Sequence, residues 1–276
     1  MNTNQYLIDH YSSRDEDGRL GSRCGSVEFL TTMRYIERYS KPGDRIMEIG
    51  AATGRYSHTL ARAGYTVDAV ELVEHNIEIF KQNTQPGEKI TVTQGNALDL
   101  SDFSDDIYDV TLLFGPLYHL FSVEDKRRAI SEAIRVTKRG GVVFAAYILS
   151  DGAVLDDGFK RGNFSIAEQI ERGLINPHTF AANMPSGATS SPLDIFDLVR
   201  VEDIDFVMSI FPTTRLHYVA ASGYARHMRE ELNAMDDDMF ELYLKYHFAT
   251  CERGDLIGMS SHTLDIFRKD SETNPN

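Results

Sequence analysis

Cysteine is scarce in this chain of 276 residues, which contains only Cys24 and Cys251. Two cysteines so far apart form no disulfide framework of the kind found in small secreted domains, and they match no zinc-binding spacing. We therefore expect a reducing, cytoplasmic environment and no metal site.

Long apolar runs are absent as well. No stretch approaches the roughly 18 apolar residues that a membrane-spanning helix requires. Residues 1–13 lack the apolar segment of a signal peptide. We therefore expect neither a membrane segment nor a membrane partner.

Basic residues are in the minority. The 28 Lys and Arg against 42 Asp and Glu give a formal net charge of −14. An acidic surface repels phosphate backbones, and the basic runs, such as residues 126–128, are short. We therefore expect no nucleic-acid partner.

Two kinds of segment alternate along the first half of the chain. Short apolar runs, several rich in β-branched residues, predict strands at 45–49, 66–72, 90–94, 109–114 and 142–148. Between them, apolar residues at helical spacing predict helices at 26–39, 55–63, 74–82 and 122–138, the last of them ended by Gly140 and Gly141. Such an alternation implies a parallel sheet with helices on both faces.

The second half breaks this alternation. Residues 150–192 mix Gly, Asp, Asn, Ser and Pro, which is typical of a long functional insertion. Helices are then predicted at 202–211, 224–235 and 237–250, and strands at 215–221 and 262–267. We predict an α/β fold with a Rossmann-like, doubly wound, mostly parallel seven-stranded sheet, an antiparallel edge hairpin and a loop-rich cap insertion.

Five segments follow from this prediction. They are an N-terminal lid at 1–24, a core at 25–149, a cap or substrate insertion at 150–200, the C-terminal part of the core at 201–269, and a flexible tail at 270–276. Apolar side chains give the cap a surface with which to cover a ligand, namely Phe159, Phe164, Phe180 and Met184.

The most informative motif lies between the first predicted strand and the helix after it, in residues 47–56. Gly50 and Gly54 lack a Cβ, so the backbone can pass close to a ligand beside the free N–H groups of the helix. Glu71 lies 71 − 50 = 21 residues beyond the first glycine, at the end of the next strand, where a carboxylate is placed to bind ribose hydroxyls. Glu48, just before the turn, would repel a pyrophosphate and suits a cationic ligand that bears an amino group.

Two other nucleotide-binding motifs fail at this turn. The dinucleotide fingerprint G-x-G-x-x-G needs glycine where Ala52 and Arg55 stand, which disfavours a nicotinamide-dependent oxidoreductase. The lysine of a phosphate-binding loop is absent too, because Arg55 and Tyr56 follow the second glycine.

With these residues the chain resembles the class I S-adenosylmethionine-dependent methyltransferase family, and in particular its bacterial small-molecule members. The first motif matches at Glu48, Gly50 and Gly54, while Gly95 to Ala97 resemble the motif of the third strand. The resemblance implies S-adenosyl-L-methionine as the cofactor. The residues it assigns to cofactor binding are Glu48, Gly50, Ala51, Thr53, Gly54, Glu71, Leu72, Asn96, Ala97 and Phe114.

Residues 115–120 resemble the loop that frames the transferred methyl group in that family. His119 is the candidate general base, because it follows the fourth strand and imidazole exchanges protons near neutral pH. Tyr118 is expected to line the methyl pocket. Anchoring of the loop by His119 and simple packing by Tyr118 are the alternative roles.

Three further residues are candidates for the lid and the acceptor site. Tyr11 and Arg19 are expected to close over the cofactor, with an exposed charged N-terminus as the alternative. His217, on a late strand, is a candidate to reach the acceptor, although a histidine on a strand is more often a core or edge residue.

The sequence leaves several functions open. Methylation of N or O in a small molecule is the leading hypothesis, and methylation of a protein or peptide and a non-catalytic cofactor-binding regulatory module are the alternatives. The loop at 115–120 lacks the Asn or Asp of the signature for nucleic-acid amine methylation, and it contains no nucleophilic cysteine. A monomer or a homodimer is expected.

Overall fold

The computed structural model describes residues 5–12, 20–163, 165–171 and 196–270. Four residues predicted above to act in the lid or the cap, Arg19, Phe164, Phe180 and Met184, lie outside these described residues.

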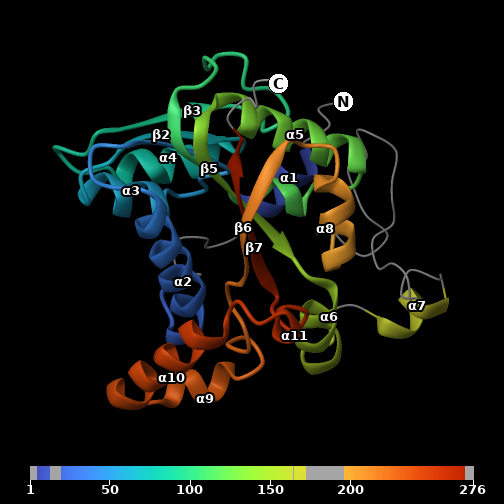
Figure 1. The fold of residues 1–276 in the computed structure, drawn as a ribbon. Coiled ribbons are helices and arrows are strands. Elements are labelled where there is room, and N and C mark those ends of the chain that lie inside the picture. The colour runs from blue at the N-terminus through green and yellow to red at the C-terminus, as the bar shows by residue number, and fades with distance from the viewer. Residues whose placement is uncertain (1–4, 13–19, 164, 172–195, 271–276) are drawn as a thin grey trace.

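A seven-stranded sheet in the order β3-β2-β1-β4-β5-β7-β6 forms the centre of the molecule (Figure 1). Strands β1 to β5 run parallel, whereas β7 runs antiparallel to both of its neighbours, β5 and β6. The predicted fold class is thus confirmed, and the two late strands do pair antiparallel at the edge of the sheet. The strands are β1 (Arg45–Ile49), β2 (Thr66–Glu71), β3 (Ile90–Gln94), β4 (Tyr108–Leu113), β5 (Thr137–Ile148), β6 (Thr213–Ala220) and β7 (His262–Lys269).

Helices join and flank these strands. The first five are α1 (Gln5–Tyr11), α2 (Arg23–Tyr39), α3 (Arg55–Arg62), α4 (Glu74–Asn83) and α5 (Val123–Val136). Later in the chain come α6 (Ser150–Ala153), α7 (Ile166–Glu171), α8 (Val201–Met208), α9 (Arg229–Ala234), α10 (Asp237–Thr250) and α11 (Gly254–Ile257). Two irregular helices complete the set, the 3₁₀ helix η1 (Pro116–Tyr118) and the π-helix η2 (Val154–Lys160).

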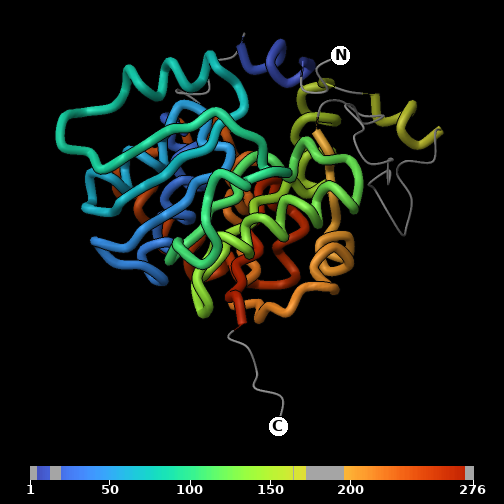
Figure 2. Tube along the Cα trace, turned by 90° about the horizontal axis from the view of Figure 1, so that it is seen from above, coloured from blue at the N-terminus to red at the C-terminus, as the bar shows by residue number. Residues whose placement is uncertain are grey.

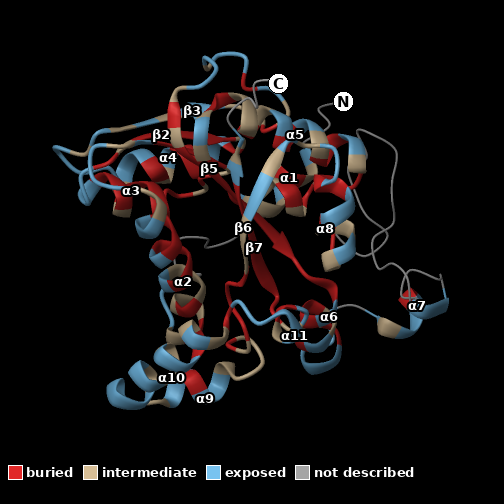
Figure 3. Cartoon of the chain, in the orientation of Figure 1, coloured by how far each residue is buried: buried red, intermediate tan, exposed pale blue. Residues whose placement is uncertain are grey.

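The core consists of two apolar layers, one on each face of the sheet. Ile36 of α2 and Leu60 of α3 pack on one face against alternate strand residues such as Phe144. Ile130 of α5 and Val207 of α8 pack on the other face. Figure 3 shows buried residues concentrated along β5 and β7, and exposed residues on the outer surface of α10.

Helix α5 begins where the sequence predicts and ends earlier. The Ser122 side chain accepts a hydrogen bond from Asp125 N–H at 2.9 Å, which caps the helix as expected. The predicted boundary at Gly140 and Gly141 is wrong, because β5 already begins at Thr137. The hydroxyl of Thr137 lies 2.6 Å from both Ala133 O and Thr111 Oγ1, which connects this residue to β4 directly after the last helical turn.

The C-terminal part of the chain differs from the prediction in its helices. The helix expected at 224–235 is confined to α9, and turns occupy the residues before it. Helices α9 and α10 lie beside one end of α2 (Figure 1), while the tube in Figure 2 shows α1 on the outside of the molecule, close to the start of the cap. None of the helices within the described residues is long and apolar enough to cross a membrane.

Candidate active site

A cavity of about 810 Å³ lies at the carboxyl ends of β1, β2 and β4. The crevice at these strand ends is where open α/β sheets bind ligands. Its wall includes most of the residues predicted from the sequence to bind a cofactor, namely Glu48, Gly50, Ala51, Thr53, Glu71, Leu72, Asn96, Ala97 and Phe114.

The glycine turn is held tightly against the loop after β4. Gly50 has a φ of +85°, and a Cβ there would lie 2.2 Å from Phe114 O and 2.6 Å from Pro116 Cδ. Gly54 has a φ of +90° and would bring a Cβ to 2.5 Å from the Phe80 ring, and it is not part of the cavity wall. Both glycines are therefore required for packing between segments of the chain, a role that the sequence analysis did not predict.

Glu71 ties the turn to the end of β2. Its carboxylate accepts hydrogen bonds from Ala52 N–H at 2.8 Å and Val73 N–H at 2.9 Å, with the Asn76 amide at 3.3 Å. Ala52 adopts a left-handed φ of +47°, which this hydrogen bond to Glu71 stabilises. Burial raises the pKa of the Glu71 carboxyl, although the backbone N–H groups oppose the shift.

Glu48 lies below the same turn and is 2% exposed. The Ser57 hydroxyl donates a hydrogen bond to its carboxylate. Burial raises the pKa of Glu48 to about 7, and the nearby Glu71 contributes in the same direction. Within the described part of the chain, neither Glu48 nor Glu71 forms an ion pair with a basic side chain.

These two carboxylates fit a positively charged nucleoside. A buried carboxylate without a partner is unfavourable, and a ligand that carries positive charge supplies the missing partner. Asn96 and Leu72 also line this part of the cavity. The Asn96 side chain accepts a hydrogen bond from Leu98 N–H at 2.9 Å, and Leu72 adds apolar surface. The residues present therefore suit a ligand with a cationic group and a ring.

The loop after β4 brings the two predicted catalytic residues to the cavity wall. Gly115, with a φ of +101°, starts the turn of η1, and His119 N–H closes it on Pro116 O at 3.0 Å. The Tyr11 hydroxyl lies 2.7 Å from His119 Nε2, and the Tyr6 hydroxyl donates to His119 O at 3.3 Å. Helix α1 thus contacts this loop through Tyr6 and Tyr11.

A buried ion pair fixes the same loop from the other side. Lys126 of α5 donates to both Leu120 O and the Asp197 carboxylate, and both ion-pairing side chains are almost fully buried. Asp197 N–H donates to Tyr118 O at 2.6 Å. Burial raises the pKa of Asp197, and the Lys126 ammonium opposes that shift. The last part of the cap, at Asp197, is therefore held against the loop that carries Tyr118 and His119.

The structure does not bring His217 to the cavity. Its Nδ1 lies 2.8 Å from Glu252 Oε2 and its Nε2 lies 2.5 Å from the Tyr39 hydroxyl, so both ring nitrogens are occupied on the far part of β6. Sequence reasoning missed several residues that line the cavity at its cap end. They are Glu28, Asp157, Arg161, Asn163, Arg226 and His262.

Comparison with known proteins agrees with this geometry. Residues 47–145 match a family described as a methyltransferase domain. The chain is 34% identical over 100 residues to a demethylmenaquinone methyltransferase of Clavibacter sepedonicus, covering 36% of this chain and 39% of that protein. It is 27% identical over 118 residues to a glycine/sarcosine N-methyltransferase of Aphanothece halophytica, covering 42% and 44%. The chain thus spans less than half the length of these relatives.

A solved structure shows the same fold over most of the chain. This is a protein of Methanosarcina mazei described as a SAM-dependent methyltransferase, with a TM-score of 0.55, 19% identity, and coverage of 86% of this chain and 98% of that one. The fold is that of a Rossmann-like α/β domain. Residues 47–145 thus match a methyltransferase domain, and the fold is that of a solved protein described as a SAM-dependent methyltransferase.

Proposed function

We propose that the protein transfers a methyl group from S-adenosylmethionine to a nitrogen or an oxygen of a small molecule. The observation that supports this proposal is the single continuous cavity, whose wall runs from Glu48 and Glu71 at the cofactor end to Tyr118 and His119 and on to the cap. When bound, S-adenosylmethionine supplies a methyl group that is already activated by its sulfonium.

The residues at the cofactor end hold and orient the donor. Glu71 is positioned for ribose hydroxyls, Leu72 and Asn96 for the adenine, and Glu48 for the cationic part of the molecule. These residues align the donor and exclude water, and in a displacement reaction these two effects contribute most of the rate enhancement. A general base is needed in addition only where the acceptor loses a proton.

His119 is the proposed base. It is 7% exposed, lies in the cavity wall and is oriented by the Tyr11 hydroxyl. Imidazole exchanges protons near neutral pH, and a hydrogen-bonded neighbour fixes the orientation of its ring. In this proposal His119 removes the proton of the acceptor, and Tyr118 lines the space beside the methyl group.

A small acceptor fits the cavity better than a peptide does. Residues from α1, α2, η2 and β7 all contribute to the wall, so the acceptor end is bounded by several elements, whereas a peptide requires an open groove. The proposal also places the protein in the cytoplasm, in keeping with the two free and buried thiols of Cys24 and Cys251.

Two measurements test this function. Calorimetry with S-adenosylmethionine should show binding that Glu71→Ala weakens by about 1–3 kcal/mol, because hydrogen bonds to a buried carboxylate are lost. Glu74→Ala, an exposed acid in the next helix, serves as the control. A panel of small amines, alcohols and phenols should then release S-adenosylhomocysteine. Turnover of peptides and of no small molecule would contradict the proposed acceptor class.

A further inference from the structure

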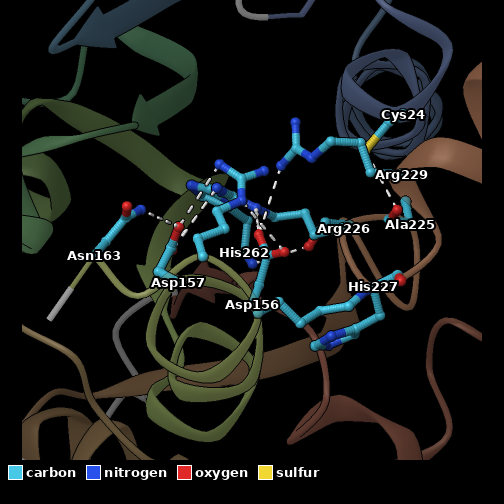
Figure 4. A network of polar contacts seen from close by, with 12 residues as sticks. Cys24, Asp156, Asp157, Asn163, Ala225, Arg226, His227, Arg229 and His262 are labelled. Atoms are coloured by element: carbon cyan, nitrogen blue, oxygen red, sulfur yellow. Dashed lines mark hydrogen bonds and ion pairs between the residues drawn. The ribbon is translucent and has the colours of Figure 1, made fainter. Parts of the chain in front are cut away.

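A network of charged side chains lies at the cap end of the cavity (Figure 4). Asp156 and Asp157 of η2 face Arg161, Arg226 and Arg229, which come from the end of η2 and from the segment around the start of α9. Segments some 70 residues apart in the chain thus meet beside the site of the proposed reaction.

Asp156 forms the buried centre of this network. Its side chain is 3% exposed, and it lies 3.2 Å from Arg226 Nε, 3.5 Å from Arg229 Nη2 and 3.6 Å from Arg161 Nε. Asp157 is contacted at 3.9 Å by both Arg161 and Arg226. Three guanidinium groups therefore face the two carboxylates of η2.

Arg161 and Arg226 lie in the cavity wall, whereas Asp156 lies behind it. The contacts of the Arg161 guanidinium with Asp156 and Asp157, at 3.6 and 3.9 Å, are longer than hydrogen bonds, and within the described residues no hydrogen bond of this side chain is present. A guanidinium has five N–H donors in a planar arrangement that matches a carboxylate or a phosphate. Arg161 thus has donors to offer a ligand in the cavity.

A series of contacts connects these arginines to the proposed reaction centre. Arg226 Nη1 lies 3.5 Å from His262 Nδ1. The His262 ring lies edge-on to Tyr118, with centroids 5.8 Å apart, and Tyr118 directly precedes His119. A ligand anchored on Arg161 and Arg226 would extend along this wall toward His119.

Two carboxylates share this end of the wall and restrict where an anion can bind. Asp157 is directed to Arg161 and Arg226, and Glu28 of α2 lies 3.3 Å from His262 Nδ1. An anion is repelled from these two carboxylates and attracted to the guanidinium groups of Arg161 and Arg226. The charges therefore define one position for a negatively charged group.

From this arrangement we infer that the acceptor carries an oxyanion, a carboxylate or a phosphate, which Arg161 and Arg226 bind while the nucleophilic atom lies beside His119. This inference rests on the proposed function and adds the chemical class of the acceptor. It makes Arg161 a specificity-determining residue.

Binding to the protein saturated with S-adenosylhomocysteine tests the inference without any turnover. Three probes of similar size are used at millimolar concentrations: benzoate, phenyl phosphate and the neutral benzamide. We expect at least one of the two anions to bind and benzamide not to bind. Arg161→Gln should weaken anion binding roughly tenfold or more, because charge-assisted hydrogen bonds are lost. Which anion binds more tightly distinguishes a carboxylate acceptor from a phosphate acceptor.

Arg268→Gln is the matched control, since Arg268 is exposed at the opposite end of β7 from His262. It should leave anion affinity unchanged. The affinity of each variant for S-adenosylhomocysteine reports whether the cofactor end is still folded. Equal binding of benzamide and the anions, no binding of either anion, or unchanged anion affinity in Arg161→Gln would each overturn the inference.

The two proposals fail in different ways. A protein that does not bind S-adenosylhomocysteine contradicts the proposed function itself. A protein that binds it and methylates only uncharged acceptors contradicts the oxyanion inference and leaves the proposed function intact.

Discussion

The hydroxyl of Tyr11 and Nε2 of His119 lie 2.7 Å apart, although 108 residues separate them in the chain. This contact joins the first helix to the loop after β4, at the wall of the cavity. It gives His119 a fixed ring orientation, which a general base requires and a packing residue does not.

His119→Gln should lower kcat for an acceptor that loses a proton by about 10²–10⁴-fold, because general-base catalysis is removed. Tyr11→Phe should lower kcat by a smaller factor, since the base remains and only its orientation is lost. Steady-state kinetics of S-adenosylhomocysteine release provide the measurement. His75→Gln, an exposed histidine of α4, is the control. Wild-type kcat in His119→Gln would show that this residue only anchors the loop.

Gly50 and Gly87 provide a test of the packing in the glycine turn. Both have a left-handed φ, +85° and +94°, but only at Gly50 would a Cβ meet other atoms within 4 Å. Gly87→Ala should therefore cost about 1–2 kcal/mol of stability through backbone strain alone. Gly50→Ala should cost a further 1–3 kcal/mol or more and displace the loop at Phe114, with loss of cofactor binding. Chemical denaturation measures both, and equal costs would contradict the close packing.

The raised pKa of Glu48 predicts a pH-dependent affinity for the cofactor. Its folded pKa of about 7 lies above the usual 4.5, so without ligand the stability that this group contributes is full below about pH 4.5 and is lost as the pH rises through 7. A cationic ligand favours the ionised form. Affinity for S-adenosylmethionine should thus rise with pH up to about 7, by tenfold per unit at most, and level off above it.

Glu48→Gln removes the titrating group and should flatten this part of the pH profile. Calorimetry at several pH values supplies the comparison, and in the cofactor-free state the variant should melt at a higher temperature than the wild type at pH 8. An identical pH profile in both proteins would show that Glu48 does not respond to the charge of the ligand.

The buried pair of Lys126 and Asp197 predicts a non-additive effect on stability. Asp197→Asn leaves the Lys126 ammonium buried without its counter-charge and should cost about 3–5 kcal/mol. Replacing both residues, Lys126→Met with Asp197→Leu, should cost less than that single change. Denaturation of the two single variants and the double variant measures the coupling. Costs that simply add would show that the two charges act independently.

The positions of most strands were predictable because they depend on local runs of apolar residues. β1 and β3 begin and end where their apolar runs do, and the Ser122 cap marks the start of α5 correctly. The start of β5 was missed, since the two glycines resemble a helix stop and the hydrogen bonds of Thr137 depend on β4. The strand order at the edge is likewise a tertiary property, because β7 inserts between β5 and β6.

The candidate site divides in the same way. The cofactor end consists of residues at fixed spacing on adjacent strand ends, so Glu48, Gly50 and Glu71 were predictable from the motif. The cap end of the cavity is lined by side chains far apart in sequence, such as Glu28 and Arg226, and no local pattern identifies it. The prediction that His217 reaches the acceptor failed for a related reason. Its position on a strand follows from local sequence, but its distance from the cavity depends on the tertiary fold.

The position of β7 has a consequence for biosynthesis. Leu264 and Ile266 are buried on β7, between β5 and β6, and His262 forms part of the cavity wall, yet all three are translated after β1 to β6. While the ribosome is still making the polypeptide, β5 and β6 each expose an unpaired side, and such edges are prone to intermolecular association. The nascent chain therefore completes the wall of the cavity only once residues 262–269 have left the exit tunnel.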